Sequence, residues 1–430
     1  MTHATVTEFV PLAKERYVSK SIWEYFVLDA LKKMKRGGLC VETCDRPTRY
    51  FGEPGARITA HVTIHEPAAF FKRCALYGDI GLGEAYSNSL WDTKDIKAVI
   101  SWFIENLNFL QGKNTSATNI PSVNFLTMLN WVKHLLRDNN LTMSRRNITE
   151  HYDLGNDFYA LWLDPSMTYS SAKFKDRNQS LQEAQAFKYD SLCRKLQLQP
   201  TDHLLEIGSG WGGFALHAAK NYGCKITGIT LSPAQAEYAK EKIAAAGLEN
   251  QISIEIKDYR HLSGSYDKIV SIEMLEAVGD RYHQAFFSQC DQLLKPKGLL
   301  GLQMITVPDH RYSSLKRSVD WIQRHIFPGS LLLSIGRVNE VLLNTSDLFL
   351  HDLEDLGNDY ARTLAIWHEN FNAVLPQVRK LGFDEAFIRS WNYYLKYCEA
   401  AFTTRNISVV QAVYTRPNNN HLQRSFGKES

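Results

Sequence analysis

Residues 203–235 read HLLEIGSGWGGFALHAAKNYGCKITGITLSPAQ, and this stretch decides the fold. A short apolar run, 203–207, leads into a glycine-rich turn, a segment of good helix formers and a second strand-like run, 225–230. Strand, turn, helix and strand in this order are typical of a parallel sheet. Gly208 and Gly210 lack a Cβ, so a ligand can come close to the backbone there. The free amides at the start of the following helix can bind the polar groups of that ligand.

The spacing of the glycines indicates which ligand the turn binds. A dinucleotide site has the pattern G-x-G-x-x-G and an acidic residue about 20 positions later. Here the pattern is Glu206-x-Gly208-x-Gly210-x-Gly212, which resembles the first motif of S-adenosylmethionine-dependent methyltransferases. Many strand-to-helix turns need glycine for packing alone, so a purely structural turn is the alternative explanation.

Composition restricts the class of protein. A chain of 430 residues exceeds one ordinary domain, so we expect two cores. The formal net charge of +3 gives no indication of a nucleic-acid partner. No apolar run approaches the ~18 residues of a membrane span, and the N-terminal residues lack the apolar core of a secretory signal. Because the seven cysteines are scattered without metal-binding spacing, we expect a cytoplasmic protein with reduced thiols and no metal site.

Residues 1–110 are predicted to form a small α+β domain that docks on lipid or on a partner. Helical spacing covers 22–34, the run 58–64 alternates as a half-buried strand does, and 77–86 is predicted to be a loop. Residues 111–150 are expected to be a linker with a basic amphipathic helix. Such a helix can lie on an anionic membrane surface, or it can pack its apolar face on a neighbouring domain.

Ordered sequence matches identify a family. They are HYDLGND at 151–157, DPSMTYS at 164–170, LEIGSGWGG at 205–213, GITLS at 228–232 with Gln235, DYR at 258–260, SIEMLEAVG at 271–279, IFPG at 326–329 and YYLKYC at 393–398. With these motifs the chain resembles the cyclopropane-fatty-acyl-phospholipid synthases, relatives of the mycolic acid cyclopropane synthases. The first motif, with His151 and Asp157, is expected to fix a loop over the cofactor.

The resemblance implies that residues 151–430 have the α/β fold of class I S-adenosylmethionine-dependent methyltransferases. This is a Rossmann-like sheet, mostly parallel with an antiparallel last strand. Apolar runs and alternation agree with it, because they predict further strands at 252–256, 268–272 and 298–305. An insertion around 307–346, with helices that follow it, is expected to form a helical cap over the substrate, since an acyl chain needs a long apolar channel.

In a sheet of this kind the ligand binds beyond the carboxyl ends of the strands. By the resemblance, Tyr169 and Ser170 contact the methionine part of S-adenosylmethionine, Gln235 contacts the ribose and Tyr259 packs beside the adenine. The second strand ends in Thr230, where most methyltransferases have an acid. The predicted cofactor-binding set is Tyr169, Ser170, Glu206, Gly208, Gly210, Gly212, Thr230, Leu231, Ser232, Gln235, Asp258 and Tyr259.

The family commonly uses a bound bicarbonate ion as the base of its reaction. A cysteine, a glutamate, a histidine, a tyrosine and a backbone amide hold that ion. By the resemblance, Glu276, Tyr360 and Ile305 match three of these positions. Ser171 replaces the cysteine and Gln303 replaces the histidine. These two departures argue against bicarbonate here.

Glu273 stands where many relatives have glycine. Our hypothesis is that its carboxylate replaces the anion as base, oriented by Gln303, with its pKa raised by burial. The alternative is a surface or salt-bridged glutamate. The reaction also needs electron-rich groups facing a carbocation, and Tyr360 and Tyr394 are the candidates. Cys398 matches a cysteine near the family's site, although a buried cysteine used for packing explains it as well.

The resemblance implies an enzyme that adds a methylene group to a cis double bond of an unsaturated phospholipid acyl chain, at the inner surface of the membrane. The products are a cyclopropane and S-adenosylhomocysteine. A homodimer is also implied. The same methyl donor could instead give methylene- or methyl-branched chains, or methylate a small amine as related plant alkaloid N-methyltransferases do. A lipid-binding protein without catalysis is a third alternative, against which the complete 206–212 loop argues.

Overall fold

The structure is a computed structural model that describes residues 8–11, 19–110, 154–420 and 422. The predicted helix within 111–150 and His151 lie outside the described residues. The chain divides into two compact units. Unit 1 comprises Met1–His134, Ser318–Ile326 and Leu375–Asn406, and unit 2 comprises Leu135–Arg317, Phe327–Val374 and Ile407–Ser430.

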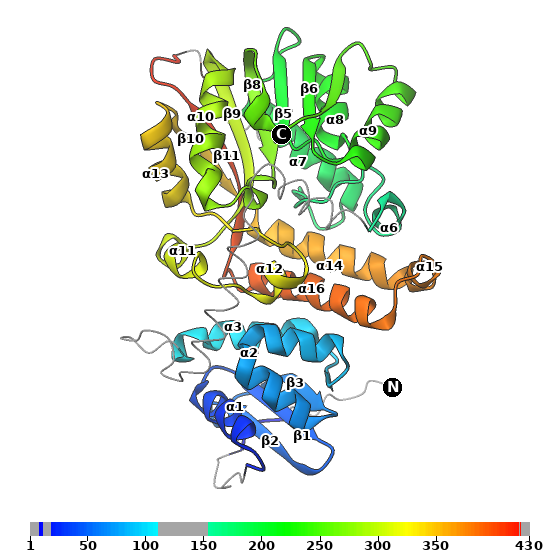
Figure 1. Cartoon of the computed structure of the whole chain (residues 1–430), viewed down its shortest axis with the longest axis vertical. Coiled ribbons are helices and arrows are strands. Elements are labelled where there is room, and N and C mark those ends of the chain that lie inside the picture. Colours follow the sequence, from blue (N-terminus) through cyan, green and yellow to red (C-terminus); the bar gives the residue numbers. More distant parts are fainter. Residues whose placement is uncertain (1–7, 12–18, 111–153, 421, 423–430) are drawn as a thin grey trace. The chain divides into compact units, whose positions relative to one another are not determined.

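Unit 2 is built on a seven-stranded sheet with the order β10-β11-β9-β8-β5-β6-β7 (Figure 1). Its strands are β5 (His203–Ile207), β6 (Lys225–Thr230), β7 (Ile252–Ile256), β8 (Tyr266–Ile272), β9 (Leu294–Thr306), β10 (Phe349–Asp355) and β11 (Ser408–Thr415). Strands β5 to β9 pair in parallel, whereas β11 is antiparallel to both β9 and β10. This confirms the predicted sheet with its antiparallel last strand.

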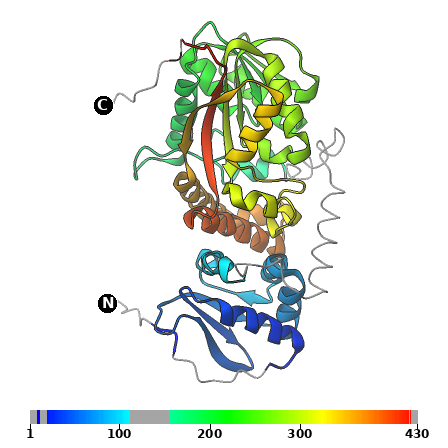
Figure 2. The ribbon, with the colours of Figure 1, turned by 90° about the vertical axis from the view of Figure 1, so that its left-hand side faces the viewer.

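Helices cover both faces of this sheet, which Figure 2 shows edge-on. The helices of unit 2 are α6 (Asn156–Ala160), α7 (Leu181–Lys195), α8 (Gly213–Tyr222), α9 (Pro233–Ala245), α10 (His283–Leu293), α11 (Asp309–Leu315), α13 (Ile335–Thr345) and α14 (Gly357–Ala373), with short 3-10 turns η1 (Tyr259–His261), η2 (Leu275–Ala277) and η3 (Asp280–Tyr282). Because side chains alternate along a strand, Leu204 packs under α7, α8 and α9, while Leu205 packs under α10 and α13.

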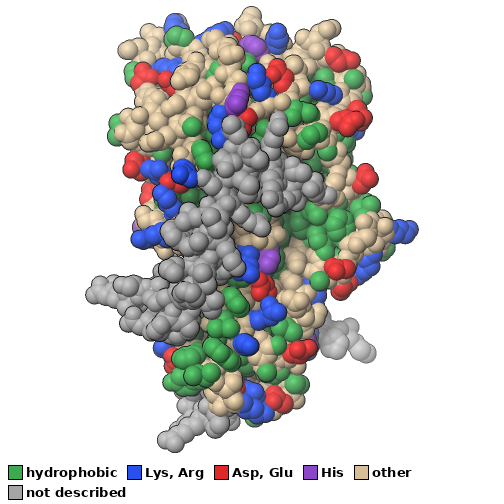
Figure 3. Space-filling model, viewed as in Figure 1, with side chains coloured by type: hydrophobic (Ala, Val, Ile, Leu, Met, Phe, Trp, Pro, Cys, Tyr) green, Lys and Arg blue, Asp and Glu red, His purple; other side chains and the backbone are tan. Residues whose placement is uncertain are grey.

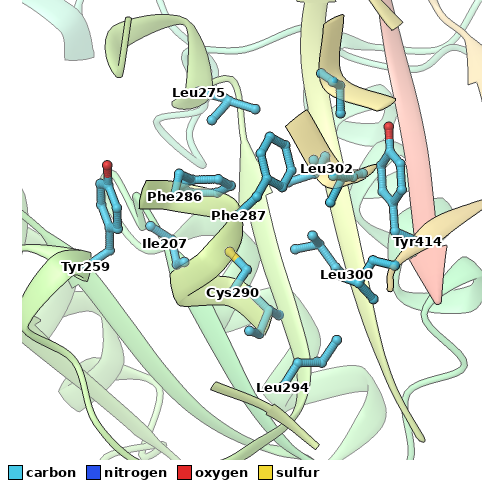
Figure 4. Packing of buried hydrophobic residues seen from close by; sticks show 14 of the residues in the cluster. Ile207, Tyr259, Leu275, Phe286, Phe287, Cys290, Leu294, Leu300, Leu302 and Tyr414 are labelled. Carbon is cyan, nitrogen blue, oxygen red and sulfur yellow. The ribbon is translucent and has the colours of Figure 1, made fainter. Parts of the chain in front are cut away.

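The apolar core on the α10 side is shown in Figure 4. Phe286, Phe287 and Cys290 of α10 are completely buried there against strand residues such as Leu300 and Leu302. Val338, Val341 and Leu342 of α13 join the same cluster at helical spacing. The predicted cap insertion over 307–346 therefore needs correction. Its longest helix, α13, covers the sheet, because its apolar stripe is buried in the core.

Unit 1 contains a four-stranded sheet with the order β2-β1-β3-β4. Its elements are β1 (Gly38–Thr43), β2 (Arg46–Gly52), β3 (Ile58–Ile64), β4 (Trp91–Asp92), α1 (Ile22–Lys33), α2 (Pro67–Ser87), α3 (Ile96–Leu110), α12 (Trp321–His325), α15 (Leu375–Lys380) and α16 (Glu385–Thr403). The alternation predicted for 58–64 is confirmed, since every second residue of β3 is buried. The loop predicted at 77–86 is wrong: it is helical, with a break at Gly78, whose φ is 56°.

The two units are not consecutive along the chain. Residues 318–326 and 375–406 were predicted to belong to the catalytic domain, but their contacts group them with unit 1. Helix α16 packs on α2 and α3 within that unit. Arg389 of α16, for example, donates to the backbone oxygens of Tyr86 (2.7 Å) and Trp91 (3.0 Å). These long-range contacts explain the difference from the predicted boundaries.

Basic and acidic side chains are interspersed on the face shown in Figure 3, in the parts of it that the structure describes. This mixture agrees with the small net charge of +3. None of the helices in residues 19–110 and 154–420 combines the length and the apolar character needed to cross a membrane.

Candidate functional site

A cavity opens in unit 2 at the carboxyl ends of β5, β6 and β8. All predicted cofactor-binding residues except Gly212 and Ser232 line it. Further residues that the sequence analysis did not single out also line it, among them Met167, Thr168, Tyr189, Trp211, Lys257, Arg260 and Met274. The sheet thus places its cavity where parallel sheets bind ligands.

The glycine-rich turn forms one wall of the cavity. Gly208 and Gly210 have φ values of 88° and 51°, which disfavour side chains. A Cβ at Gly208 would lie 2.8 Å from Cγ of Met274, whereas a Cβ at Gly210 would meet no atom within 4 Å. Gly208 therefore serves close packing, and Gly210 leaves space that a ligand can use.

Gly212 and Ser232 do not line the cavity and have structural roles, so their predicted contact with the cofactor stays a prediction. Gly212 has a φ of 86° and begins α8, and a Cβ there would lie 3.1 Å from that of Ala239. The hydroxyl of Ser232 accepts a hydrogen bond from the amide of Gln235 (3.3 Å) and so caps α9. The local need for a tight turn and for a cap explains both residues.

The carboxyl group of Glu206, at the end of β5, indicates that the cavity binds a ligand. Its side chain is buried, and its Oε2 atom has no hydrogen-bond partner within the described residues. Burial raises its pKa well above the ordinary value, and the charge of Lys188 opposes this shift. Because buried polar atoms are normally satisfied, this oxygen fits a ligand that donates a hydrogen bond in the cavity.

The segment before the cavity is tied to the glycine turn by Asn156. Its Oδ1 accepts from the indole N–H of Trp211 (2.8 Å), and its amide donates to the backbone oxygen of Ala234 (3.1 Å). Asp157, which was predicted to fix this loop, is exposed. The neighbouring amide of Asn156 makes both contacts because it can donate and accept at once, while the predicted role of Asp157 stays a prediction.

Two further elements complete the cofactor side of the cavity. The hydroxyl of Thr230 donates to Oε1 of Gln235 (2.8 Å), and both side chains are buried. Burial alone would raise the pKa of Asp258, but hydrogen bonds from Arg260 (2.7 and 2.9 Å) lower it. A carboxylate and an amide are thus held at the carboxyl ends of neighbouring strands, beside the cavity.

Glu273 is the first residue after β8 and faces the same cavity. Its Oε1 accepts hydrogen bonds from the amide of Ser171 (2.8 Å) and from Nε2 of Gln303 (2.8 Å), and Tyr360 donates a further one. Its φ is 47°, which costs a non-glycine residue about 1–2 kcal/mol. The alternative of a surface glutamate is wrong, since the site holds this carboxylate in a strained backbone conformation.

The side chain of Gln303 is fixed by a second glutamine. Gln411 of β11 is the register partner of Gln303 on β9, and its Nε2 donates to Oε1 of Gln303 (3.1 Å). The Nε2 of Gln303 therefore points to Glu273 and to the backbone oxygen of Ser171 (3.2 Å). The sequence analysis did not single out Gln411. A glutamine in the otherwise mostly apolar strand 408–415 could have indicated that its side chain orients another buried polar group.

The hydroxyl of Ser171 bonds to the neighbouring backbone. It is completely buried and donates to the backbone oxygen of Ala172 (2.9 Å), while the backbone amide of Ser171 serves Glu273. Ser171 thus contributes through its main chain, which any residue type could supply. The predicted place of Ser171 in the catalytic set, where the family has a cysteine, stays a prediction.

Glu276 lies close to Glu273 but has a different environment. It accepts from the backbone amides of Ile305 and of Glu276 itself, and its Oε2 has no partner among the described residues. Burial and the nearby charge of Glu273 raise its pKa to about 8. Burial also raises the pKa of Glu273, but Gln303, Lys188, Ser171 and Tyr360 oppose that shift. The donors and the ammonium around Glu273 thus favour its ionised form, whereas Glu276, next to that charge, is protonated at neutral pH.

Aromatic rings connect the cofactor side of the cavity with Glu273. The ring of Tyr169 lies 5.3 Å from that of Trp367, which lies 6.0 Å from the ring of Tyr360. Trp367 was not predicted, and it is completely buried. Tyr394 and Cys398 belong to α16 in unit 1, so their predicted roles at this site stay predictions.

Comparisons with known proteins identify relatives of this chain. A family model described as mycolic acid cyclopropane synthetase matches residues 139–412. The tuberculostearic acid methyltransferase UfaA1 of Mycobacterium tuberculosis is 37% identical over 355 residues, which are 81% of this chain and 81% of that protein. The cyclopropane-fatty-acyl-phospholipid synthase of Escherichia coli K12 is 34% identical over 370 residues, 85% of this chain and 90% of that protein.

Solved structures agree with this result. The mycolic acid cyclopropane synthase CmaA1 complexed with SAH and CTAB aligns with a TM-score of 0.58 and 31% identity, over 63% of this chain and 98% of its own. Coclaurine N-methyltransferase aligns with a TM-score of 0.60 over 78% of this chain and 99% of its own, but at 20% identity it shows the fold alone. The chain therefore belongs to the mycolic acid cyclopropane synthetase family of class I S-adenosylmethionine-dependent methyltransferases.

Proposed function

We propose that this enzyme transfers a one-carbon unit from S-adenosylmethionine to a cis double bond of an unsaturated phospholipid acyl chain and closes it to a cyclopropane. The observation that carries the proposal is the carboxylate of Glu273, held at the cavity wall by three donors. The similarity to the Escherichia coli cyclopropane-fatty-acyl-phospholipid synthase supports the choice of substrate. Since such chains lie in membranes, the enzyme would work at the inner membrane surface; a homodimer stays a prediction.

The cavity fits the cofactor of this family. Gly210 leaves room for it, Oε2 of Glu206 offers a free acceptor, and Gln235 and Asp258 lie at the neighbouring strand ends. When bound, S-adenosylmethionine supplies an electrophilic methyl group on a sulfonium. Tyr169 lines the cavity and its ring packs on that of Trp367. It would orient the methyl-bearing end of the cofactor.

The residues of this chain then stabilise and deprotonate a carbocation that forms on the acyl chain. The π electrons of the alkene form the new bond to the added carbon, so the second alkene carbon becomes positive. Tyr360 and Trp367 present electron-rich rings, each worth about 0.5–2 kcal/mol to such a cation. Glu273 takes a proton from the added carbon, and the electron pair of that C–H bond closes the ring. Hydrogen bonds from Gln303 and Tyr360 favour the ionised form of this carboxylate and orient it for this step.

A second product has support from one relative, the tuberculostearic acid methyltransferase. If a hydride moves from the methyl-bearing carbon to the cation before deprotonation, loss of a proton from the added carbon leaves a branched chain with a methylene group. Glu273 serves as base in both routes, so its geometry does not distinguish them. The amine methyltransferase has no comparable support, because its similarity concerns the fold alone.

The test is incubation of the purified enzyme with vesicles of dioleoyl phospholipid and methyl-labelled S-adenosylmethionine, followed by mass analysis of the released fatty acids. A gain of one CH2 with loss of the double bond is the expected result. A gain with unsaturation retained would establish the branched product instead. Vesicles of saturated phospholipid are the control. Failure to label any unsaturated acyl chain would overturn the proposal.

The first prediction concerns bicarbonate. Because Glu273 supplies the carboxylate from the chain itself, the rate in carbonate-depleted buffer should stay within about twofold of the rate in buffer with added bicarbonate. The same depletion applied to the Escherichia coli synthase is a useful parallel measurement. A strong requirement for added bicarbonate would contradict the assignment of the base.

The second prediction concerns Glu276→Gln and the dependence of stability on pH. The pKa of Glu276 is about 8 in the folded protein and 4.5 ordinarily, so the folded state binds this proton more tightly than the unfolded state does. The contribution of this group to the free energy of unfolding of wild type therefore decreases as the pH rises from 4.5 to about 8. Above that pH it changes no further. Glutamine cannot ionise, so the variant should gain stability relative to wild type over this range. Urea unfolding at pH 5, 6.5 and 8 measures the difference, and a constant difference would contradict the protonation state.

A further inference from the structure

Lys188 of α7 is a charged residue that has no place in the mechanism above. It is completely buried, and its Nζ donates a hydrogen bond of 2.7 Å to the hydroxyl of Ser170, which lines the cavity. The same Nζ lies 4.2 Å from the ring centroid of Tyr189, another residue of the cavity wall. A buried ammonium is costly unless it has partners, so its presence calls for a role.

The charged groups that act on Lys188 come from three other segments around the cavity. They are Glu273 after β8, Asp164 in the loop before Ser170, and Glu206 at the end of β5. Lys188 acts in turn on both Glu206 and Glu273. Glu273 also faces Glu276 and the hydroxyl of Tyr360. Ser170, to which Lys188 donates, lines the same cavity as Glu206 on the cofactor side and Glu273, the proposed base, so the ammonium is held beside a wall that carries both acids.

The direction of these effects is the same for both glutamates. Burial raises the pKa of Glu206 and of Glu273, and the charge of Lys188 lowers both. Burial lowers the pKa of Lys188 itself to about 7, against the three acids that favour its charge. Removing the ammonium would leave both glutamates protonated up to a higher pH.

We propose that Lys188 is a positioning residue that couples the two halves of the cavity. Its ammonium fixes the hydroxyl of Ser170 and stabilises the ionised carboxylates of Glu206 and Glu273 at once. The part that concerns Glu273 rests on the proposed function, whereas the part that concerns Glu206 does not.

The test replaces Lys188 by methionine, which has a similar length and no charge. The value of kcat should rise with pH as Glu273 ionises, because it must be ionised to act as base, and we call this rise the acid limb. In Lys188→Met the acid limb should lie about one pH unit higher than in wild type. At pH values below this limb the rate should therefore be about tenfold below wild type, and this deficit should shrink as the pH rises. A merely structural role would lower the rate by the same factor at every pH.

Two conservative variants and a matched control complete the design. Lys188→Arg keeps a charge and should bring the acid limb back toward that of wild type. Ser170→Ala removes the hydrogen bond but not the ammonium, so its acid limb should stay in place. Lys195→Met is the control, because Lys195 lies on the same helix, is mostly buried and pairs with Asp352 away from the cavity. Thermal denaturation of each variant checks that it is folded.

S-adenosylhomocysteine binding measured by calorimetry from pH 5.5 to 9 gives a readout that does not require the base. Its affinity should fall at a higher pH in Lys188→Met than in wild type, since Glu206 protonates earlier. If only this binding profile moves, the coupling to Glu273 is refuted, while the assignment of the base is tested separately by Glu273→Gln. If neither profile moves in a folded variant, the proposal for Lys188 is overturned.

Discussion

Glu273→Gln is expected to lower kcat for labelled-methyl incorporation by about 10²–10⁴-fold, the usual contribution of a general base. Glutamine keeps the size of the side chain and an oxygen that can accept from Ser171 and Gln303. It cannot take up the proton that the added carbon must lose. The affinity for S-adenosylhomocysteine should stay within about threefold of wild type, because removing a base leaves the binding of the cofactor product intact. Single-turnover assays with labelled cofactor and calorimetry measure the two quantities.

Glu241→Gln is the control for this substitution, since Glu241 is exposed on α9 and lies outside the cavity. It should behave as wild type in both assays. Restoration of Glu273→Gln by added bicarbonate would show that the chain still has a working anion site. Full activity of Glu273→Gln without bicarbonate would refute the carboxylate as base.

Glu206→Leu is expected to weaken S-adenosylhomocysteine binding about 10–100-fold and to raise the melting temperature of the empty enzyme. The free Oε2 of Glu206 has no partner within the described residues, and burial raises the pKa of its carboxyl. An unsatisfied buried polar group costs about 1–3 kcal/mol, which leucine removes. In the complex the same oxygen can accept from the ligand, and losing a hydrogen bond to a charged group costs about 1.5–3 kcal/mol. The opposite signs distinguish a binding residue from a structural one.

Calorimetry and thermal denaturation of the ligand-free enzyme test this prediction. Glu255→Leu is the matched control, because Glu255 is an exposed strand residue of the same sheet that does not line the cavity. It should leave the affinity unchanged. Wild-type affinity in Glu206→Leu would show that the cofactor makes no use of this carboxylate.

The sequence predicted the core elements of unit 2 well. The strands at 203–207, 225–230 and 252–256 were found with the predicted bounds, and β8 and β9 contain the predicted strands. The glycine turn faces the cavity at Gly208 and Gly210 as expected. These features follow from periodicity and from turn chemistry, which depend on residues close together in the chain.

Predictions failed where distant contacts decide. The helix α13 covers the sheet, and residues 318–326 and 375–406 belong to unit 1, although both segments read as parts of a cap. An apolar stripe shows that a helix face is buried, but it does not show which surface buries it. Asn156 and Asp157 are neighbours, and only the position of Trp211 selects the first of them.

The amino-acid sequence by itself determined the fold class and the succession of strands along the chain, because these depend on local pattern and residue identity. Only the tertiary structure decided which groups favour the ionised form of Glu273. Gln411, Gln303 and Lys188 act on Glu273 from β11, β9 and α7, and the two glutamines are 108 positions apart. A pKa depends on burial and on charges brought near by folding, so the chemistry of this carboxylate became defined only when the sheet was assembled.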